Sequence, residues 1–268
     1  MCRHNKGEHG EGKQGGTALN PVEKLVLDHP PANALNMTVL RGLLGEIKKM
    51  DRDPQIRVVH LQSGNPYLFS SGLDLNGLLH TGRWRTALRI YKAERLVYRI
   101  VRAIRRSKKL YIAELNGSVI GSAASIALAC DFRMGNQDVW FWFPDPKYGG
   151  LLADGGLLLL RDSVGLENAR KLCLSMERIQ ASDALAYGCL HRMVDRDALT
   201  DTVHFFASEL TSRSAISLCQ TKRMLNRPAR LHFPYRSLAR VLCSKEMIQR
   251  LRDACRHDTV KHGKGVNL

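Results

Sequence analysis

Residues 115–133 have the sequence LNGSVIGSAASIALACDFR and lie at the centre of the pattern from which the architecture can be predicted. The apolar run at 110–115 that leads into them is typical of a buried strand. Residues 121–130, which are mostly small, predict a helix, and residues 131–134 predict the next strand. Strand, helix and strand in succession favour an α/β core.

The same alternation extends to both sides of this segment. Apolar residues recur at helical spacing in two longer stretches, at 36–50 and 84–106, and short apolar runs at 22–27 and 57–62 predict strands. An aromatic run at 140–143 predicts one more strand, with one face either in the core or along a ligand pocket. From Gly165 onward the pattern is almost entirely helical, so we expect an α/β core followed by an α-helical tail.

Length and composition exclude several classes of protein. The chain has 268 residues, of which 44% are hydrophobic, and this is enough for one or two domains with a sizeable core. No stretch approaches about 20 consecutive apolar residues, so we predict no membrane span. Seven scattered cysteines, none spaced as CxxC, indicate free thiols in a reducing compartment and no structural metal site.

The first residues differ from the rest. The segment MCRHNKGEHGEGKQGG, residues 1–16, is rich in Gly, Lys and His and has no hydrophobic periodicity, so we expect a disordered leader over residues 1–19. It has no apolar core and is therefore not a secretory signal. Glu8, Glu11 and a single Arg make it a poor transit peptide.

Four segments carry a family resemblance. They are PPANALN at 30–36, FSSGLDL at 69–75, LNG…LACDFR at 115–133, and residues 178–188 followed by Val194. In order and spacing they resemble the crotonase superfamily of enoyl-CoA hydratases and isomerases, and within it the mitochondrial 3,2-trans-enoyl-CoA isomerases. A further segment, SKEMIQ at 244–249, is similar to a helix of the same isomerases, and the likeness covers about residues 20–256.

The resemblance implies an architecture, an assembly and a compartment. The expected fold is α/β, a crotonase-type spiral of ββα turns over residues 20–200. An α-helical region at 201–268 is expected to mediate a homotrimer. The family suggests the mitochondrial matrix.

The expected ligand is a fatty acyl-CoA thioester, whose enolate must be stabilised when an alpha proton is removed. Two backbone N–H groups directed at the thioester oxygen provide that stabilisation, and by position they belong to Ser71 and Ser122, the second at a helix N-terminus. Relatives have Gly-Gly where this chain has Ser122-Ala123, which would narrow the site. The other residues expected to bind substrate are Asn33, Ala34, Leu35, Gly72, Leu73, Asp74, Gly121 and Trp142.

The base of the isomerases is a glutamate, and the matching position is Asp145. Its carboxylate is withdrawn by about 1.5 Å, and misplacement of that order lowers rates. Apolar neighbours would raise its pKa toward the range useful for proton transfer; alternatively, Asp145 is a turn residue between two prolines. The second carboxylate of the hydratases is replaced by Ser125, and Asp154 is a candidate second acid or a capping residue.

A strongly basic segment occupies residues 83–109, and the whole chain has a formal net charge of +16. Such a segment can bind RNA phosphates, flank the diphosphate of CoA, or form a solvated surface. Its only acid is Glu94.

Two functions are consistent with these residues. The first is a Δ3,Δ2-enoyl-CoA isomerase of fatty acid β-oxidation, in which Asp145 moves a proton from C2 to C4. It would use no metal or separate cofactor, since coenzyme A is part of the substrate. The second is a catalytically impaired crotonase-like subunit with a structural or RNA-associated role in a mitochondrial assembly.

Overall fold

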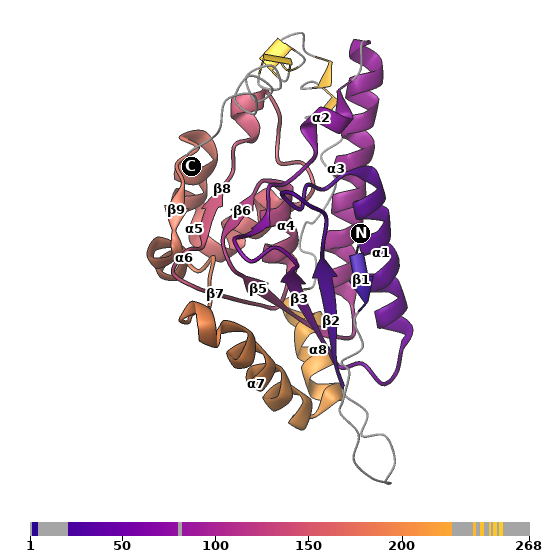
Figure 1. Ribbon diagram of the computed structural model, residues 1–268, viewed down its shortest axis with the longest axis vertical. Helices are drawn as coiled ribbons and strands as arrows, with labels where there is room; N and C mark the ends of the chain where they lie inside the picture. Colours follow the sequence, from indigo (N-terminus) through magenta and orange to yellow (C-terminus); the bar gives the residue numbers. More distant parts are fainter. Residues whose placement is uncertain are drawn as a thin grey trace.

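Two sheets form the centre of the molecule (Figure 1). The computed structural model describes residues 2–4, 21–79, 82–226, 238–239, 242–243, 247, 249–250 and 252–253. The larger sheet contains, in order, β1 (Cys2–His4), β2 (Val22–Leu27), β3 (Val58–Ser63), β5 (Leu110–Leu115), β7 (Phe132–Gly135) and β10 (Arg192–Met193). The smaller sheet contains β4 (Leu68–Ser70), β6 (Ser118–Ile120), β8 (Trp140–Trp142) and β9 (Ile179–Gln180).

The chain alternates between the two sheets as it advances. Strands β3, β5 and β7 lie in the larger sheet, and each is followed directly by β4, β6 or β8 in the smaller one. The ladders β3·β5, β5·β7, β4·β6 and β6·β8 are all parallel. Each turn therefore adds one strand to each sheet, which is the spiral of ββα turns that was predicted.

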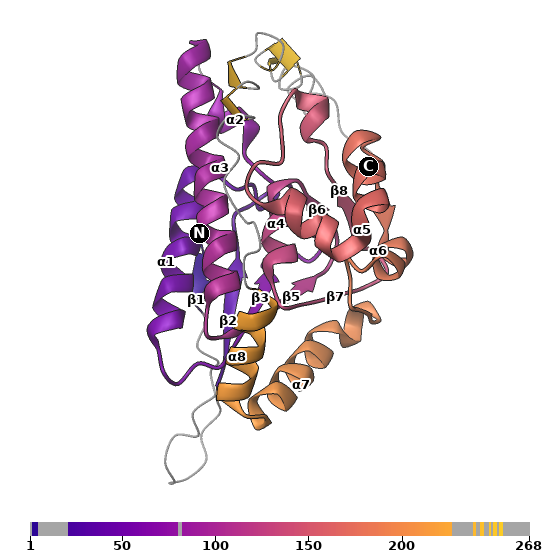
Figure 2. The same ribbon diagram turned by 180° about the vertical axis from the view of Figure 1, so that it is seen from behind.

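Helices complete the turns. They are α1 (Met37–Arg52), α2 (Leu75–Leu78), α3 (Arg83–Arg106), α4 (Ser122–Ala129), η1 (Asp145–Tyr148), α5 (Gly156–Leu174), α6 (Ala181–Tyr187), η2 (Arg196–Ala198), α7 (Leu199–Ser212) and α8 (Ala215–Leu225). Helices α1 and α3 lie side by side (Figures 1 and 2). Asn36 caps α1, because its side chain accepts the amide N–H groups of Thr38 and Val39.

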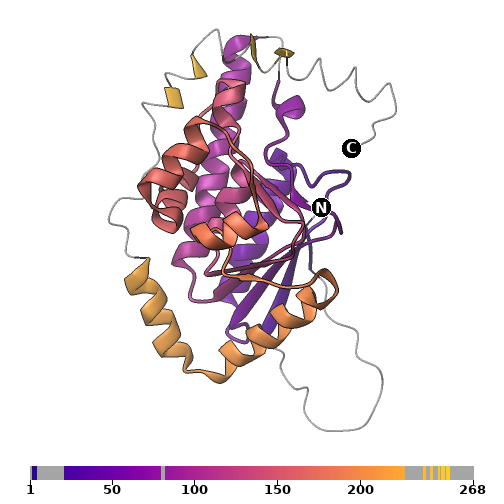
Figure 3. The same ribbon diagram turned by 90° about the vertical axis from the view of Figure 1, so that its left-hand side faces the viewer.

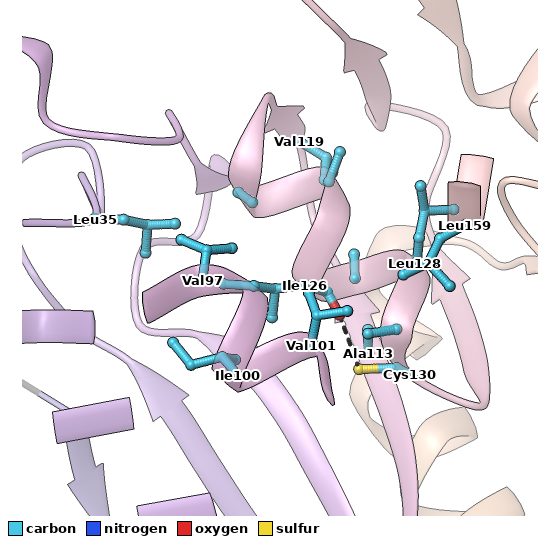
Figure 4. Packing of buried hydrophobic residues seen from close by; sticks show 14 of the residues in the cluster. Leu35, Val97, Ile100, Val101, Ala113, Val119, Ile126, Leu128, Cys130 and Leu159 are labelled. Carbon is cyan, nitrogen blue, oxygen red and sulfur yellow. Dashed lines mark hydrogen bonds between the residues drawn. The ribbon is translucent and has the colours of Figure 1, made fainter. Parts of the chain in front are cut away.

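Helix α4 is buried along its whole length. Its small residues permit this, since α3 and α5 both pack against it. Figure 4 shows Ile126 of α4 beside Val97 and Val101 of α3. A helix in this position begins inside the protein, and its N-terminal amide groups are therefore shielded from bulk solvent.

A second apolar cluster lies between the larger sheet and α7. Val58 and Ile112 of the sheet pack with Val203 and Leu210 of the helix. In Figure 3 the orange helices α7 and α8 follow one another along the lower side of the molecule, with α7 next to the strands. Most of the described residues of the predicted C-terminal helical region belong to these two helices. The role of this region in trimer formation stays a prediction.

The bounds of the predicted elements agree closely with the observed ones, but the short strands β4, β6, β9 and β10 were not predicted, and β9 and β10 interrupt the region expected to be almost entirely helical. A further departure lies near the N-terminus. Cys2–His4 forms an antiparallel ladder with β2, which departs from the disorder predicted for residues 1–19. The other residues of that segment lie outside the described ones. Most of the SKEMIQ segment lies outside them as well, although Met247 and Gln249 are helical.

Candidate active site

A cavity of about 440 Å³ lies where the ends of β4 and β6, α3 and η1 meet. Its lining is mostly apolar and includes three acidic residues but no lysine, arginine or histidine among those described. The residues used below that line it are Ala34, Ser71, Gly72, Leu73, Asp74, Ile90, Glu94, Gly121, Ser122, Trp142, Asp145 and Tyr148.

The turn after β4 brings backbone against the start of α4. Gly72 has φ +83°, and a Cβ at this position would lie 2.7 Å from the Ile120 carbonyl oxygen. Only glycine fits such a contact without strain. Ser70 stabilises the turn, because its hydroxyl donates to the Asn33 carbonyl oxygen at 2.7 Å.

Two amide N–H groups in this region have no acceptor among the described residues, those of Leu73 and Ser122. Both residues line the cavity. Ser122 is the first residue of α4, where the helix dipole adds positive potential. This pair has the character of an oxyanion hole, with donors held ready for a ligand oxygen.

The prediction that Ser71 supplies one of the donors is wrong. The Ser71 amide donates to the Ala32 carbonyl oxygen at 3.0 Å, so the N–H is already bonded. The amide that is free to act as the donor at this turn belongs to Leu73, two residues further along the chain. Ser71 still lines the cavity.

Six of the eight residues expected to contact substrate do line the cavity: Ala34, Gly72, Leu73, Asp74, Gly121 and Trp142. Asn33 and Leu35 do not. The Asn33 side chain is buried in a network with Ser63 and the Phe69 carbonyl, and Leu35 packs in the core with 1% of its surface exposed. Both residues hold the loop that presents Ala34.

The Ser122-Ala123 departure leaves the cavity open. Ser122 lines it, whereas Ala123 is fully buried in the core cluster and is not among the lining residues. Gly121, with φ +53°, has open space where a Cβ would be. The Cβ of Ala123 therefore does not narrow the ligand site.

Asp145 begins η1 at the edge of the cavity. Its Oδ2 is buried and has no hydrogen-bonding partner. Burial, and then the nearby Asp154 carboxyl, raise the pKa of Asp145 to about 7. At neutral pH this carboxyl is therefore close to half-protonated, as a group that both accepts and returns a proton needs to be.

Asp154 is fully buried and is not among the residues that line the cavity. Its Oδ1 accepts the Ser125 hydroxyl at 2.8 Å and the Gly156 amide at 2.9 Å. Burial raises its pKa, although these two hydrogen bonds act in the opposite direction. Its contacts are those of a capping residue that raises the pKa of its neighbour, and a direct role as second acid has no support in this geometry.

A residue that the sequence analysis passed over is Glu94. It was counted among the charges of the basic segment, but it faces inward from α3, is 3% exposed and lines the cavity. Its Oε2 has no partner. The signal was available in the helical spacing, because Glu94 lies four residues after Ile90 and three before Val97, on the apolar face of α3.

The aromatic run at 140–143 was expected to face either the core or a ligand pocket. Some of its residues lie in the core and one lines the cavity. Phe141 and Phe143 are buried in the core, while Trp142 lines the cavity. The Trp142 indole N–H donates to the Met176 carbonyl at 2.9 Å. Lys147 and Arg178 lie over its ring at 5.2 and 4.7 Å, which fixes its orientation.

The basic segment forms an exposed row of cations on α3, which we call the α3 stripe. It consists of Arg85, Arg89, Lys92, Arg95, Arg99, Arg102 and Arg106. None of them forms an ion pair within the described part of the chain. Lys109 does not belong to it, because its ammonium group is buried and donates to the Ile56 carbonyl.

No described helix is both long and apolar enough to span a membrane. No group of three or more His, Cys, Asp or Glu side chains in the described ranges is arranged to hold a metal ion.

The comparisons with known proteins identify the family of this chain and agree with its fold. The model of the enoyl-CoA hydratase/isomerase family matches residues 18–255. A probable enoyl-CoA hydratase of Mycobacterium leprae is 30% identical over 78% of this chain and 81% of its own length. A short-chain enoyl-CoA hydratase of Clostridium acetobutylicum is 25% identical over 77% of this chain and 78% of its own length.

Solved structures show the same fold. The enoyl-CoA hydratase of Bacillus halodurans superposes with a TM-score of 0.80 at 21% identity, covering 94% of this chain and 99% of its own. These relatives are named as hydratases, so the expected special likeness to isomerases has no support from them. The chain belongs to the enoyl-CoA hydratase/isomerase family.

Proposed function

We propose that this protein is a Δ3,Δ2-enoyl-CoA isomerase. The observation that carries the proposal is the position of Asp145, a carboxyl with a pKa of about 7 in the same cavity as the free amides of Leu73 and Ser122. A base and an oxyanion hole are the two groups that deprotonation next to a thioester requires.

The reaction begins with proton removal from C2 of a 3-enoyl-CoA by the Asp145 carboxylate. The electron pair moves into the thioester carbonyl, and the resulting negative charge on oxygen is stabilised by the two N–H groups. Return of a proton to C4 then gives the trans-2-enoyl-CoA. Because the amides are fixed at the ends of β4 and β6, they need no reorganisation as the charge forms.

Isomerisation is favoured over hydration by the surroundings of Ser125. This residue takes the position where the related hydratases have a second carboxylate, and it is fully buried with its hydroxyl bonded to Asp154. No carboxylate on α4 faces the cavity to activate a water molecule.

The test is a comparison of two substrates with the purified protein. With 3-hexenoyl-CoA we expect conversion to 2-hexenoyl-CoA, followed by absorbance of the conjugated thioester. With crotonyl-CoA we expect hydration at least about 100-fold slower, since general acid–base assistance is worth 10²–10⁴-fold. Faster hydration than isomerisation would show that the protein is a hydratase.

We place this reaction in fatty acid β-oxidation in the mitochondrial matrix. Imaging of the full chain in cells would test this localisation.

A second candidate function rests on the α3 stripe. We propose that it binds RNA, because seven exposed cations without acidic partners lie along one helix. Reversal of Arg95, Arg99, Arg102 and Arg106 to Glu is expected to abolish binding of single-stranded RNA. In the parent protein, affinity should fall steeply with salt as counterions are released.

The matched control reverses four exposed cations of the neighbouring helix α1, namely Arg41, Lys48, Lys49 and Arg52. It changes the net charge of the protein by the same amount. Equal loss of RNA binding in both variants would indicate a general effect of net charge and would show that the α3 stripe is not a specific RNA-binding surface.

A further inference from the structure

We propose that Glu94 is a second proton-transferring residue of this cavity, which protonates the acyl chain at C4 while Asp145 takes the proton from C2. This inference rests on the proposed isomerase function and deepens it. It assigns separate groups to the two proton transfers of that reaction.

The position of Glu94 is unusual for a glutamate. Helix α3 turns its charged residues outward and packs apolar residues such as Val97 and Val101 against the core. Glu94 lies on the apolar face, where a carboxyl without compensation is unfavourable. Its Oε2 is buried without a partner, and the open space it lines is the substrate cavity.

No positively charged partner accounts for this carboxyl among the described residues, and the Ala153 amide is its backbone hydrogen-bond donor. The cavity has no described basic residue that could pair with it. The other titratable side chains that line the cavity are Asp74, Asp145 and Tyr148. Asp154 does not line it but is close enough to act on the charge of Glu94. Of these acids, Asp74 caps α2 by accepting the Gly77 amide at 2.9 Å, and Asp154 is held by Ser125. Glu94 and Asp145 are left with unbonded oxygens in one cavity.

The two carboxyls differ in protonation. Burial, followed by the charges of Asp154 and Asp145, raises the pKa of Glu94 well above its usual range, with partial opposition from the Ala153 amide. The raised pKa favours the protonated form of Glu94, which can donate a proton, whereas Asp145, with a pKa of about 7, is available as a base. Carboxyls whose environments separate their pKa values provide an acid and a base in one site.

The two transfers balance without any other reactant. The C2–H bond breaks and its proton goes to Asp145, while the electron pair enters the thioester as the enolate. When the carbonyl reforms, a C2–C3 double bond forms, and the electron pair of the C3–C4 double bond takes the Glu94 proton at C4. Proton transfer from Asp145 to the Glu94 carboxylate then restores both groups.

The test is Glu94→Gln, which keeps the shape of the side chain and removes its acidic proton. Turnover of 3-hexenoyl-CoA should fall about 100-fold or more in kcat, with KM changed only a few-fold. Deuterium exchange at C2 of hexanoyl-CoA requires the base and the oxyanion hole but no C4 donor. It should stay within a few-fold of the parent rate.

Glu114→Gln is the matched control. This carboxyl lies on β5, is bonded to His60 and Thr200 and is not among the residues that line the cavity, so turnover by this variant should remain near that of the parent. If Glu94→Gln does not fold, as judged by circular dichroism, Glu94→Asp is measured instead. It keeps an acidic proton on a shorter side chain, so we expect exchange to be retained and turnover to be reduced.

Three outcomes would overturn the inference. Full turnover in the folded Glu94→Gln protein would show that Asp145 alone performs both transfers. Equal loss of exchange and turnover would show that Glu94 only supports the site. A parent protein with neither exchange nor turnover would refute the isomerase function itself, and this result is distinct from the other two.

Discussion

At the scale of single residues, Asp145 combines access to the cavity with burial of one carboxyl oxygen. Its side chain is one methylene shorter than the glutamate expected at this position. We predict that Asp145→Glu keeps or raises turnover of 3-hexenoyl-CoA, by up to about 100-fold, because it restores reach in a cavity of about 440 Å³. A fall of more than 10-fold would show that the cavity is shaped for aspartate.

Glu94 also makes stability depend on pH. Its folded pKa lies above the ordinary value of 4.5, so the unfolded chain releases a proton that the folded protein holds. The stability that this group contributes is therefore complete below pH 4.5 and is lost as pH rises toward the folded pKa. We predict that Glu94→Gln raises the thermal midpoint at pH 8 by several degrees and that this gain disappears near pH 4.5.

Scanning calorimetry from pH 4.5 to 8 measures this difference. Glu209→Gln, at an exposed position on α7, is the control for the substitution itself. A midpoint difference for Glu94→Gln that does not vary with pH would contradict a protonated Glu94 in the folded protein.

The sequence identified Asp145 and Ser122 because they stand at fixed distances from motif glycines. It did not identify Leu73, because the choice between neighbouring amides depends on which one is already bonded, and the Ser71 amide is bonded to Ala32. Glu94 was missed because a charged residue in a basic helix was taken as solvated. Its place on the apolar face of α3 would have distinguished it.

At the scale of elements, the turn after β4 and the start of α4 form the oxyanion hole together. Gly72 allows their close approach. We predict that Gly72→Ala lowers stability by about 1–3 kcal/mol through backbone strain and lowers kcat/KM as well, because the Leu73 amide moves.

Urea denaturation and 3-hexenoyl-CoA kinetics check both effects. Gly45→Ala is the control, since a Cβ at this position on α1 meets nothing within 4 Å and alanine favours a helix. A Gly72→Ala protein as stable and as active as the parent would show that the turn tolerates a side chain.

The long helices were predictable from their period. Their apolar faces recur over several turns, and the observed ends of α1 and α3 lie within two residues of the expected ones. The short strands were harder, because β4 and β6 have three residues each, and a period of two is not established over three residues. Strands β4 and β6 form because they pair in parallel with strands that are distant in the sequence.

At the scale of the whole molecule, both of the helices α7 and α8 carry large apolar side chains that are exposed. Phe205, Ile216, Met224 and Leu225 are each at least 66% exposed on α7 and α8. Such groups are typical of a surface that becomes covered in an assembly. We predict a homotrimer and expect Ile216→Asp combined with Leu225→Asp to shift it toward monomers.

Light scattering coupled to size-exclusion chromatography measures the mass. Leu88→Asp, at an apolar position on α3 that is 50% exposed, is the control and should leave the trimer intact. A parent protein that elutes as a monomer would contradict the prediction.

The spiral of two sheets was predictable only through the family resemblance. Composition and periodicity indicate an α/β core, but they do not state which strand pairs with which. That information lies in contacts between residues far apart in the chain, such as the ladder between β3 and β5. Helix α4, whose hydrophobic residues show no preferred face, is specified by burial on all sides.

The central claim is that Asp145 removes a proton from C2 of an acyl-CoA held by the Leu73 and Ser122 amides. Deuterium exchange at C2 of hexanoyl-CoA in D2O, followed by mass spectrometry, tests it most directly. We predict exchange by the parent protein and a loss of about 10²–10⁴-fold in Asp145→Asn, with hexanoyl-CoA still bound. Exchange at the parent rate in Asp145→Asn, or none in the parent protein, would contradict the account.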